Sequence, residues 1–369
     1  FRDDDRTAEA LGRLNEARDW PGFVAALRDF HSPQQNIVYA DRTGRIGMVT
    51  PGRVPNRRDG FDVSAETGWS HLIPFDRLPR RADPPSGRIV NANNRLVDET
   101  YPYYLGREWE APYRALRIET LLDAGTAHAA IQNDTVSLSA RELLPYLLSA
   151  VPDVRLQAWD GDMARNRPEP LIYMAWVREA MRAVFADELG PLFEAWWAYR
   201  PLVLRRALLD RPAWCDDTGT KAKETCKDRL ALAHRRAVAF LQERYGAETP
   251  PWGEVHRARF AHPVAGRIPL LRDLLDREIA TGGGPTTVNR GSARFSDERH
   301  PFRHSHGAGY RAIYNLDDLD KSRFIQAVGQ SGNPFSPHYD DLMELWRDGA
   351  YITLEPAKPP VHHLLLRPE

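Results

Sequence analysis

The amino-acid sequence predicts an α+β fold in which a helical lobe is inserted into a β-rich core. The main observation is that the spacing of apolar residues changes from strand-like to helix-like and back to strand-like along the chain. In addition, 369 residues exceed the length at which a single hydrophobic core usually splits. We therefore expect a helical segment at 1–32, a β-rich segment at 33–112, the helical lobe at 113–250 and a second β-rich segment at 251–369.

Two short helices and a hairpin are predicted first. Apolar residues recur at helical spacing over residues 6–30, with a break at Pro21. The segment IVYADRTGRIGMV, residues 37–49, is β-branched and aromatic, and Asp41–Gly44 within it predicts a four-residue turn. A long loop with an extended piece around Trp69 follows, and Gly87–Ala92 is expected to form another strand.

Helices are predicted through the middle of the chain. Ser139–Glu142 has the pattern of a capping box before a leucine-rich run. Three longer helices are expected over residues 171–186, 191–209 and 227–245. Their aromatic residues lie at helical spacing, so we interpret them as core rather than as a cofactor site.

The C-terminal part combines strands with two helices. One helix is expected within residues 264–281 and another from Ser336–Pro337, where an N-cap residue precedes a proline. Gly282–Gly284 is interpreted as a flexible turn. Strands are predicted at 286–289, 310–314, 324–328 and 351–354.

The composition gives no reason to expect nucleic acid or a membrane as a partner. Lysine plus arginine (50) nearly balances aspartate plus glutamate (51), for a net charge of -1. Apolar runs stay well below the roughly 18 residues that would suggest a membrane-spanning helix.

The two cysteines, Cys215 and Cys226, are separated by a polar stretch. They would form one disulfide in an oxidising compartment, although two unrelated buried thiols remain an alternative. A zinc site is disfavoured because no second pair of ligands accompanies them. His300, His304 and His306 lack a metal-ligand frame and are interpreted as a polar loop, so no metal site is predicted.

Several strings, taken together and in order, resemble the β chain of the penicillin acylases. The wider penicillin amidase family, to which the set is similar, includes cephalosporin acylases and acyl-homoserine lactone acylases. The matching strings span nearly the whole chain and are QQNIVYADRTGRIGMVTPGRVPNRRDG, LIPFDRLPR, GRIVNANN, YRALRIETLL, Asn133-Asp134, AWDG, GGGPTTVNRG and VGQSGNPFSPHYDDLMELWRDGAY.

The resemblance implies roles for three residues. Asn93 matches the asparagine whose side-chain amide points into the oxyanion hole, and Arg114 matches the arginine that orients the surroundings of the nucleophile. Gln35 matches a residue that lines the acyl pocket and is apolar in penicillin G acylases, so its polarity disfavours a phenylacetyl preference. Without the resemblance, Asn93 would be interpreted as a turn asparagine and Arg114 as a surface cation.

The resemblance also implies an αββα N-terminal-nucleophile hydrolase fold, which would be incomplete in this chain. In this family a precursor cleaves itself into an α chain and a β chain, and the new N-terminal Ser attacks the amide. Phe1 has no hydroxyl or thiol, so we expect the nucleophile upstream of it, and the partners to be the α chain and the earlier part of the β chain.

The expected substrate is a small-molecule N-acyl amide, namely a β-lactam, an N-acyl homoserine lactone or a related amine, as in antibiotic biosynthesis or quorum quenching. No organic cofactor is implied. The family's structural calcium is disfavoured because Tyr103–Gly106 offers no carboxylate. A periplasmic or secreted location is expected. A non-catalytic homologue that acts as a scaffold is the alternative hypothesis.

Overall fold

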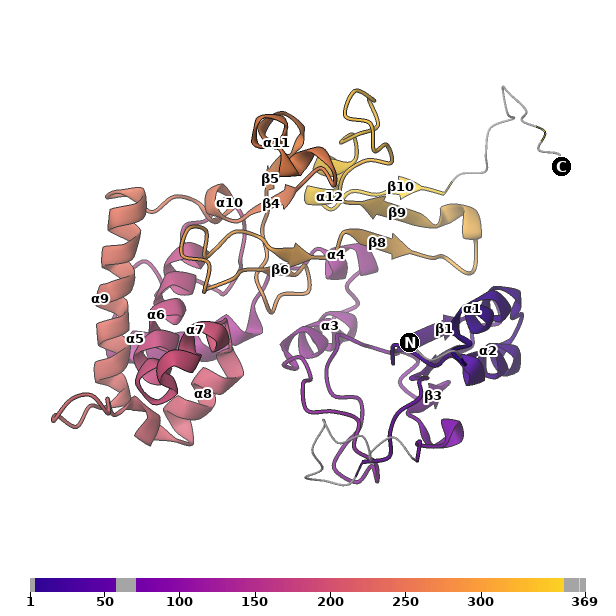
Figure 1. Ribbon diagram of the computed structural model, residues 1–369, viewed down its shortest axis with the longest axis horizontal. Helices are drawn as coiled ribbons and strands as arrows, with labels where there is room; N and C mark the ends of the chain where they lie inside the picture. The colour runs from indigo at the N-terminus through magenta and orange to yellow at the C-terminus, as the bar shows by residue number, and fades with distance from the viewer. Residues whose placement is uncertain (1–3, 58–70, 355–364, 366–369) are drawn as a thin grey trace. The chain divides into compact units, whose positions relative to one another are not determined.

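The computed structural model describes residues 4–57, 71–354 and 365. The chain divides into two compact units (Figure 1). Unit 1 comprises residues 1–115 and 315–319, and unit 2 comprises residues 116–314 and 320–369. The expected extended piece around Trp69 lies outside the described residues.

Unit 1 begins with α1 (Thr7–Glu16) and α2 (Trp20–Ala26), which a 3-10 turn at Leu27–Asp29 extends. Pro21 lies in the first turn of α2, where its missing N–H costs nothing, and Asp19 caps that helix by accepting from the Gly22 N–H. The predicted pair of helices is therefore confirmed, with Pro21 in the first turn of the second helix.

The predicted hairpin in unit 1 is also present. Strands β1 (Ile37–Ala40) and β2 (Ile46–Val49) pair antiparallel, and β3 (Arg80–Ala82) pairs with β2. The connecting loop is one residue longer than expected, because the Asp41 N–H donates to the Arg45 carbonyl. One face of this sheet joins an apolar core made by Ala10, Phe23, Leu27, Phe30 and Val49.

The expected strand at Gly87–Ala92 is not formed. Its backbone is irregular, and no strand among the described residues pairs with it. An apolar, β-branched pattern specifies a strand only where a neighbouring strand completes the ladder. A short 3-10 turn, Phe75–Arg77, precedes β3, and the remainder of unit 1 from Asp83 to Pro112 consists of turns and loops.

Helix α3 (Tyr113–Asp123) begins in unit 1 and continues without a break into unit 2. The other helices of unit 2 are α4 (His128–Gln132), α5 (Leu138–Ala150), α6 (Glu169–Leu189), α7 (Phe193–Trp196), α8 (Pro201–Leu209), α9 (Cys226–Tyr245), α10 (Trp252–Val255), α11 (Pro269–Leu275) and α12 (Met343–Arg347). Short 3-10 turns lie at Gly190–Leu192, Pro212–Cys215, Ala265–Arg267 and Leu319–Lys321, the last at a boundary between the units.

Helix α6 forms the centre of unit 2. It is buried on nearly every side and packs along α9, with α7, α8 and α10 also in contact (Figure 1). Trp176 is fully buried there, and its indole N–H donates to the Leu230 carbonyl on α9. Because α6 is buried on nearly every side, including the ion-paired Arg178 and Glu179, it is a core helix rather than an amphipathic surface helix.

The small sheets of unit 2 are antiparallel. Strands β4 (Arg257–Phe260) and β5 (Arg277–Ala280) form one pair, and β6 (Gly291–Ser292) and β7 (His306–Gly307) form another. Strand β9 (Arg323–Gln326) lies between β8 (Tyr310–Ile313) and β10 (Ile352–Thr353). The predicted strands at 310–314, 324–328 and 351–354 are thus confirmed.

Two helix predictions for the helical lobe need correction. The cap of α5 is Ser137, which accepts from the Ala140 N–H, while the hydroxyl of Ser139 bonds Thr286 and Tyr199 instead. The helix expected over 191–209 is interrupted, because Pro201 has no N–H for a preceding turn and starts α8.

Three predictions in the C-terminal part also differ from the structure. Residues 286–289 form turns, because the Thr287 hydroxyl bonds the Gly284 N–H and the Asn289 carbonyl. Gly282–Gly284 is packed rather than flexible, with the Gly283 N–H donating to the Met163 carbonyl. The last helix starts at Met343, because the Ser336 hydroxyl closes a local turn on the His338 N–H.

Candidate active site

Asn93 lies in a turn of three asparagines that is held by their own side chains. The carboxamide oxygen of Asn91 accepts from the Asn93 N–H at 3.2 Å, and that of Asn94 accepts from the Ala92 N–H at 3.2 Å. Asn93 has a left-handed backbone, with φ of 61°, which asparagine tolerates better than most residues do. This conformation leaves the Asn93 side chain exposed.

Arg114 is brought into contact with Asn93. From the first turn of α3, its Nη2 donates to the Ala92 carbonyl at 2.7 Å and to the Asn93 Oδ1 at 2.9 Å. A guanidinium has donors and no acceptor, so the atom of Asn93 that faces it is the amide oxygen. The NH₂ group of Asn93 is consequently directed away from Arg114 and is available to donate.

Gln35 is exposed, and it directly precedes a residue that contacts this turn. Its neighbour Asn36 makes the contact, because the Asn36 Nδ2 donates to the Asn91 Oδ1 at 3.2 Å. The Asn36 Oδ1 in turn accepts from the Thr50 hydroxyl at 2.9 Å, just after β2. Sequence reasoning missed Asn36, and the only signal for it was its place in the QQN string.

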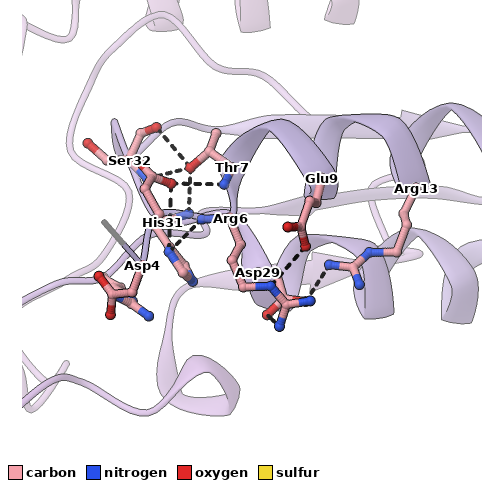
Figure 2. A network of polar contacts seen from close by, with 10 residues as sticks. Asp4, Arg6, Thr7, Glu9, Arg13, Asp29, His31 and Ser32 are labelled. Carbon is pink, nitrogen blue, oxygen red and sulfur yellow. Dashed lines mark hydrogen bonds and ion pairs between the residues drawn. The ribbon is translucent and has the colours of Figure 1, made fainter. Parts of the chain in front are cut away.

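A polar network anchors the segment before Gln35 to α1 (Figure 2). The Thr7 hydroxyl accepts from the backbone N–H of His31 at 3.0 Å and from that of Ser32 at 3.2 Å. The Arg6 N–H donates to the His31 Nδ1, and Arg6 and Arg13 both pair with Asp29. The segment that delivers Asn36 to the asparagine turn is therefore fixed at its start.

A hollow of about 510 Å³ lies in the same unit. Its lining includes Tyr101, Tyr103 and Trp109, together with Arg95 and the carboxylate of Asp98. Hydrogen bonds from the hydroxyl and N–H of Thr100 lower the pKa of Asp98. Next to Trp109, the Glu110 N–H donates to the Asn93 carbonyl at 3.1 Å, so one wall is attached to the asparagine turn.

No metal centre is found in the part of the chain that the structure describes, where no group of three or more His, Cys, Asp or Glu side chains could hold an ion. His304 belongs to a packed stack rather than to a purely polar loop. Its ring lies 4.9 Å from that of the buried His256, its Nδ1 bonds the Thr281 hydroxyl, and burial lowers its pKa to about 4.

Cys215 and Cys226 are joined in a disulfide at the start of α9, with their Cα atoms 4.9 Å apart. Cys215 is buried against the helical core, and the charged loop between them is tied to that core. Arg229 pairs with Asp217 of the loop at 2.7 Å, and the Asp187 carboxylate on α6 accepts from the Thr218 N–H. Across the described helices, none is both long and apolar enough to cross a bilayer.

The architecture is that of the penicillin acylases, which are N-terminal-nucleophile hydrolases. The crystal structure of penicillin G acylase from Alcaligenes faecalis matches with a TM-score of 0.68 over 99% of this chain and 73% of its own, at 19% sequence identity. The pattern of the penicillin amidase family matches residues 1–361, and the chain belongs to that family.

Characterised relatives carry two kinds of name. The penicillin acylase 2 proenzyme of Pseudomonas sp. (strain SE83) is 31% identical over 96% of this chain and 48% of its own. The acyl-homoserine lactone acylase QuiP of Pseudomonas aeruginosa is 28% identical over the same shares. The chain thus spans about half the length of these relatives.

Proposed function

We propose that this chain is part of an amidohydrolase that cleaves the side-chain amide of a β-lactam or a related N-acyl amine, N-acyl homoserine lactones included. Membership of the penicillin amidase family supports the reaction class. The names of the relatives support both kinds of substrate. The whole protein then acts through an acyl-enzyme on an N-terminal Ser contributed by a part of the protein outside these residues.

The observation that carries the proposal is the contact of Arg114 with the Asn93 amide oxygen. Attack on an amide carbonyl places a negative charge on its oxygen, and a preorganised N–H donor at that point is worth about 3 kcal/mol. Arg114 turns the Asn93 NH₂ outward and holds it there. In this proposal the NH₂ group of Asn93 donates to the oxyanion, and Arg114 holds the Asn93 side chain in the orientation that allows it.

The remaining parts of the proposal concern the setting of the reaction. Gln35 and Asn36 contribute to the acyl pocket, and the rest of the β chain and an α chain produced by self-cleavage complete the site. A location in the periplasm or outside the cell is part of the proposal, and the disulfide supports an oxidising compartment. The reaction needs no organic cofactor.

The test uses the product of the complete gene, assayed against penicillin G, a glutaryl-type amide and a long-chain acyl-homoserine lactone. Asn93→Asp keeps the oxygen for Arg114 and a residue that tolerates the left-handed backbone, but it loses the donor. We expect kcat to fall by about a hundredfold or more on whichever substrate is turned over. Asn94→Asp is the matched control, because its oxygen still accepts from Ala92, and its kcat should stay within about twofold.

The outcomes separate the alternatives. Turnover that is lost only in Asn93→Asp supports the acylase with Asn93 at the oxyanion. Turnover that is equal in both variants removes Asn93 from the mechanism. Absence of turnover together with absence of self-cleavage would support the non-catalytic scaffold instead.

A further inference from the structure

The asparagine turn of unit 1 bonds every polar group of Asn93 except its carboxamide NH₂. The Asn93 N–H donates to the Asn91 Oδ1 at 3.2 Å, and the Asn93 carbonyl accepts from the Glu110 N–H at 3.1 Å. The Asn93 Oδ1 accepts from Arg114 at 2.9 Å. The bond to Asn91 is the one that closes the turn, because an asparagine side chain that accepts from the N–H two residues further on holds the backbone between them.

Asn91 is itself held by a chain of side-chain hydrogen bonds that leads away from the turn. Its Oδ1 accepts from a second donor, the Nδ2 of Asn36, at 3.2 Å. The Asn36 Oδ1 accepts from the Thr50 hydroxyl at 2.9 Å. Thr50 is only 4% exposed, and its N–H donates to the Pro79 carbonyl at 3.0 Å. The chain therefore ends on buried backbone, between the end of β2 and the start of β3.

The direction of this chain follows from its backbone donor. A backbone N–H can only donate, so the atom of Asn91 that faces the Asn93 N–H is the amide oxygen. An amide oxygen can only accept, so Asn36 must turn its NH₂ towards Asn91 and its oxygen towards the Thr50 hydroxyl. Each carboxamide thus has one orientation, because a flip of Asn36 would place two acceptor oxygens face to face.

We propose that Asn36 and Thr50 are positioning residues, which act through Asn91 on the backbone of Asn93 and so set the direction of its NH₂ group. This inference rests on the proposed function. All four residues belong to unit 1. The left-handed backbone of Asn93, with φ of 61°, is supported by the Asn91 oxygen, and that oxygen stays in place because Asn36 also donates to it.

Small displacements of an oxyanion donor have a large effect on rate. The donor must lie at hydrogen-bond distance from the oxygen of the transition state, and misplacement by about 1 Å can cost on the order of a hundredfold. A loosened turn keeps part of the correct geometry, so a smaller loss is expected. Because the donor meets a full negative charge only in the transition state, the loss should fall on kcat rather than on KM.

The first experiment measures kcat and KM for Thr50→Val and Thr50→Ser in the complete enzyme. Valine has the shape of threonine without the hydroxyl, whereas serine keeps the hydroxyl. We expect Thr50→Val to lower kcat roughly fivefold or more with KM within about twofold, and Thr50→Ser to stay within about twofold of wild type. Thr43→Val is the matched control, because it removes a hydroxyl bond to Asp41 in the turn of the same hairpin and should leave kcat unchanged.

The second experiment removes the donor of Asn36. In Asn36→Asp, the carboxylate keeps an oxygen for Thr50 but sets a second acceptor against the Asn91 Oδ1, so kcat should fall about tenfold or more. Asn94→Asp adds a carboxylate to the same turn without removing the bond between Asn36 and Asn91, and it controls for the added charge. A raised KM with an unchanged kcat would assign Asn36 to the acyl pocket alone and overturn its positioning role.

A double variant distinguishes positioning from general stability. In an Asn93→Asp background, Thr50→Val should cause less than about a twofold further loss of kcat, since no donor is left to aim. An equal loss in both backgrounds would overturn the inference, as would an unchanged kcat in both Thr50→Val and Asn36→Asp. Thermal melting checks that Thr50→Val folds, and Asn36→Asp, at a partly exposed side chain, carries the test if it does not.

Failure of the inference can be told apart from failure of the proposed function. If Asn93→Asp keeps full activity, the proposed role of Asn93 is wrong and the chain of hydrogen bonds has no donor to position. If Asn93→Asp loses activity while Asn36→Asp and Thr50→Val keep it, only the positioning inference is wrong.

Discussion

Helix α6 and the asparagine turn are held by different forces. Helix α6 is surrounded by apolar side chains from α8, α9 and α10, and its stability comes from burial. The turn around Asn93 belongs to no strand or helix. It is held by directional hydrogen bonds that Asn36 and Arg114 donate and that Asn94 accepts. Burial tolerates small shifts of position, whereas hydrogen bonds fix angles.

The difference teaches that fold stability and chemistry are separable in this chain. A change within the α6 core should lower the free energy of unfolding and leave the chemistry of the remaining folded molecules intact. A change of Asn93 or Arg114 should lower activity and leave the free energy of unfolding almost unchanged. Each prediction below, made for the complete protein, tests one side of this contrast.

The largest expected effect is on stability. Trp176→Ala removes a fully buried ring from α6, together with the indole N–H that donates to the Leu230 carbonyl. Such a substitution should lower the free energy of unfolding by about 3–5 kcal/mol, as measured by urea denaturation. Leu192→Ala, at a side chain that is 70% exposed, is the control and should change it by less than about 0.5 kcal/mol. A loss below about 1 kcal/mol for Trp176→Ala would contradict the view that burial around α6 stabilises the fold.

Removal of the disulfide also tests the stability of the helical lobe, with a smaller expected change in the free energy of unfolding. Replacing Cys215 and Cys226 by serine opens a loop that spans 11 positions. In the chain-entropy account this lowers the free energy of unfolding by about 3 kcal/mol, while kcat should stay unchanged. Wild-type protein unfolded in reductant should reproduce the loss, and a matching loss of kcat would show that the lobe and the chemistry are coupled.

The third prediction concerns the asparagine turn. Arg114→Lys keeps the positive charge but loses the planar donor group that contacts both Ala92 and Asn93. We expect kcat to fall by roughly ten- to a hundredfold, equivalent to about 1.4–2.7 kcal/mol in the barrier, with a melting temperature close to wild type. Arg107→Lys, an exposed arginine of the preceding loop, is the control. A variant that melts early would assign Arg114 to stability instead.

The last prediction concerns the pH dependence of stability in unit 2. Burial holds the pKa of His304 down to about 4, and burial also holds the pKa of the stacked His256 well below its ordinary value. In the unfolded chain histidine binds a proton near pH 6.5. The unfolded state thus gains protons first as the pH falls, and stability is lost between about pH 6.5 and 4.

The slope of that loss should be on the order of 1 kcal/mol per pH unit for each buried histidine. Urea denaturation at several pH values measures it. His304→Gln should flatten the profile, because glutamine does not titrate but can still bond Thr281. A profile with the same slope in the variant would assign the acid sensitivity to groups other than His304.

The contrast also explains what the sequence could predict. The long runs with helical period predicted the central helices α6 and α9 correctly. The reason is that apolar residues at helical spacing are the residues that become buried when the helix packs. The hairpin and the strands β8, β9 and β10 followed from alternation and turn residues. The disulfide followed from two cysteines in a polar stretch.

Failures arose where a side chain or a partner overrode local propensity. The pattern at Gly87–Ala92 lacked a pairing strand among the described residues, and a hydroxyl of Thr287 closed the turns at residues 286–289. The asparagine turn has no periodicity at all, so only the family resemblance pointed to Asn93 and Arg114. Their contact is a feature of the structure, while their chemical roles remain a prediction.

The outward-facing carboxamide of Asn93 has a consequence for the ageing of the protein. Slow hydrolysis of that amide in storage releases ammonia and leaves an aspartate, which fits the left-handed backbone and pairs with Arg114 at least as well. The fold would survive while an anion replaced the donor. The activity of a stored preparation would therefore fall in proportion to the fraction of deamidated molecules, while its melting temperature would stay unchanged.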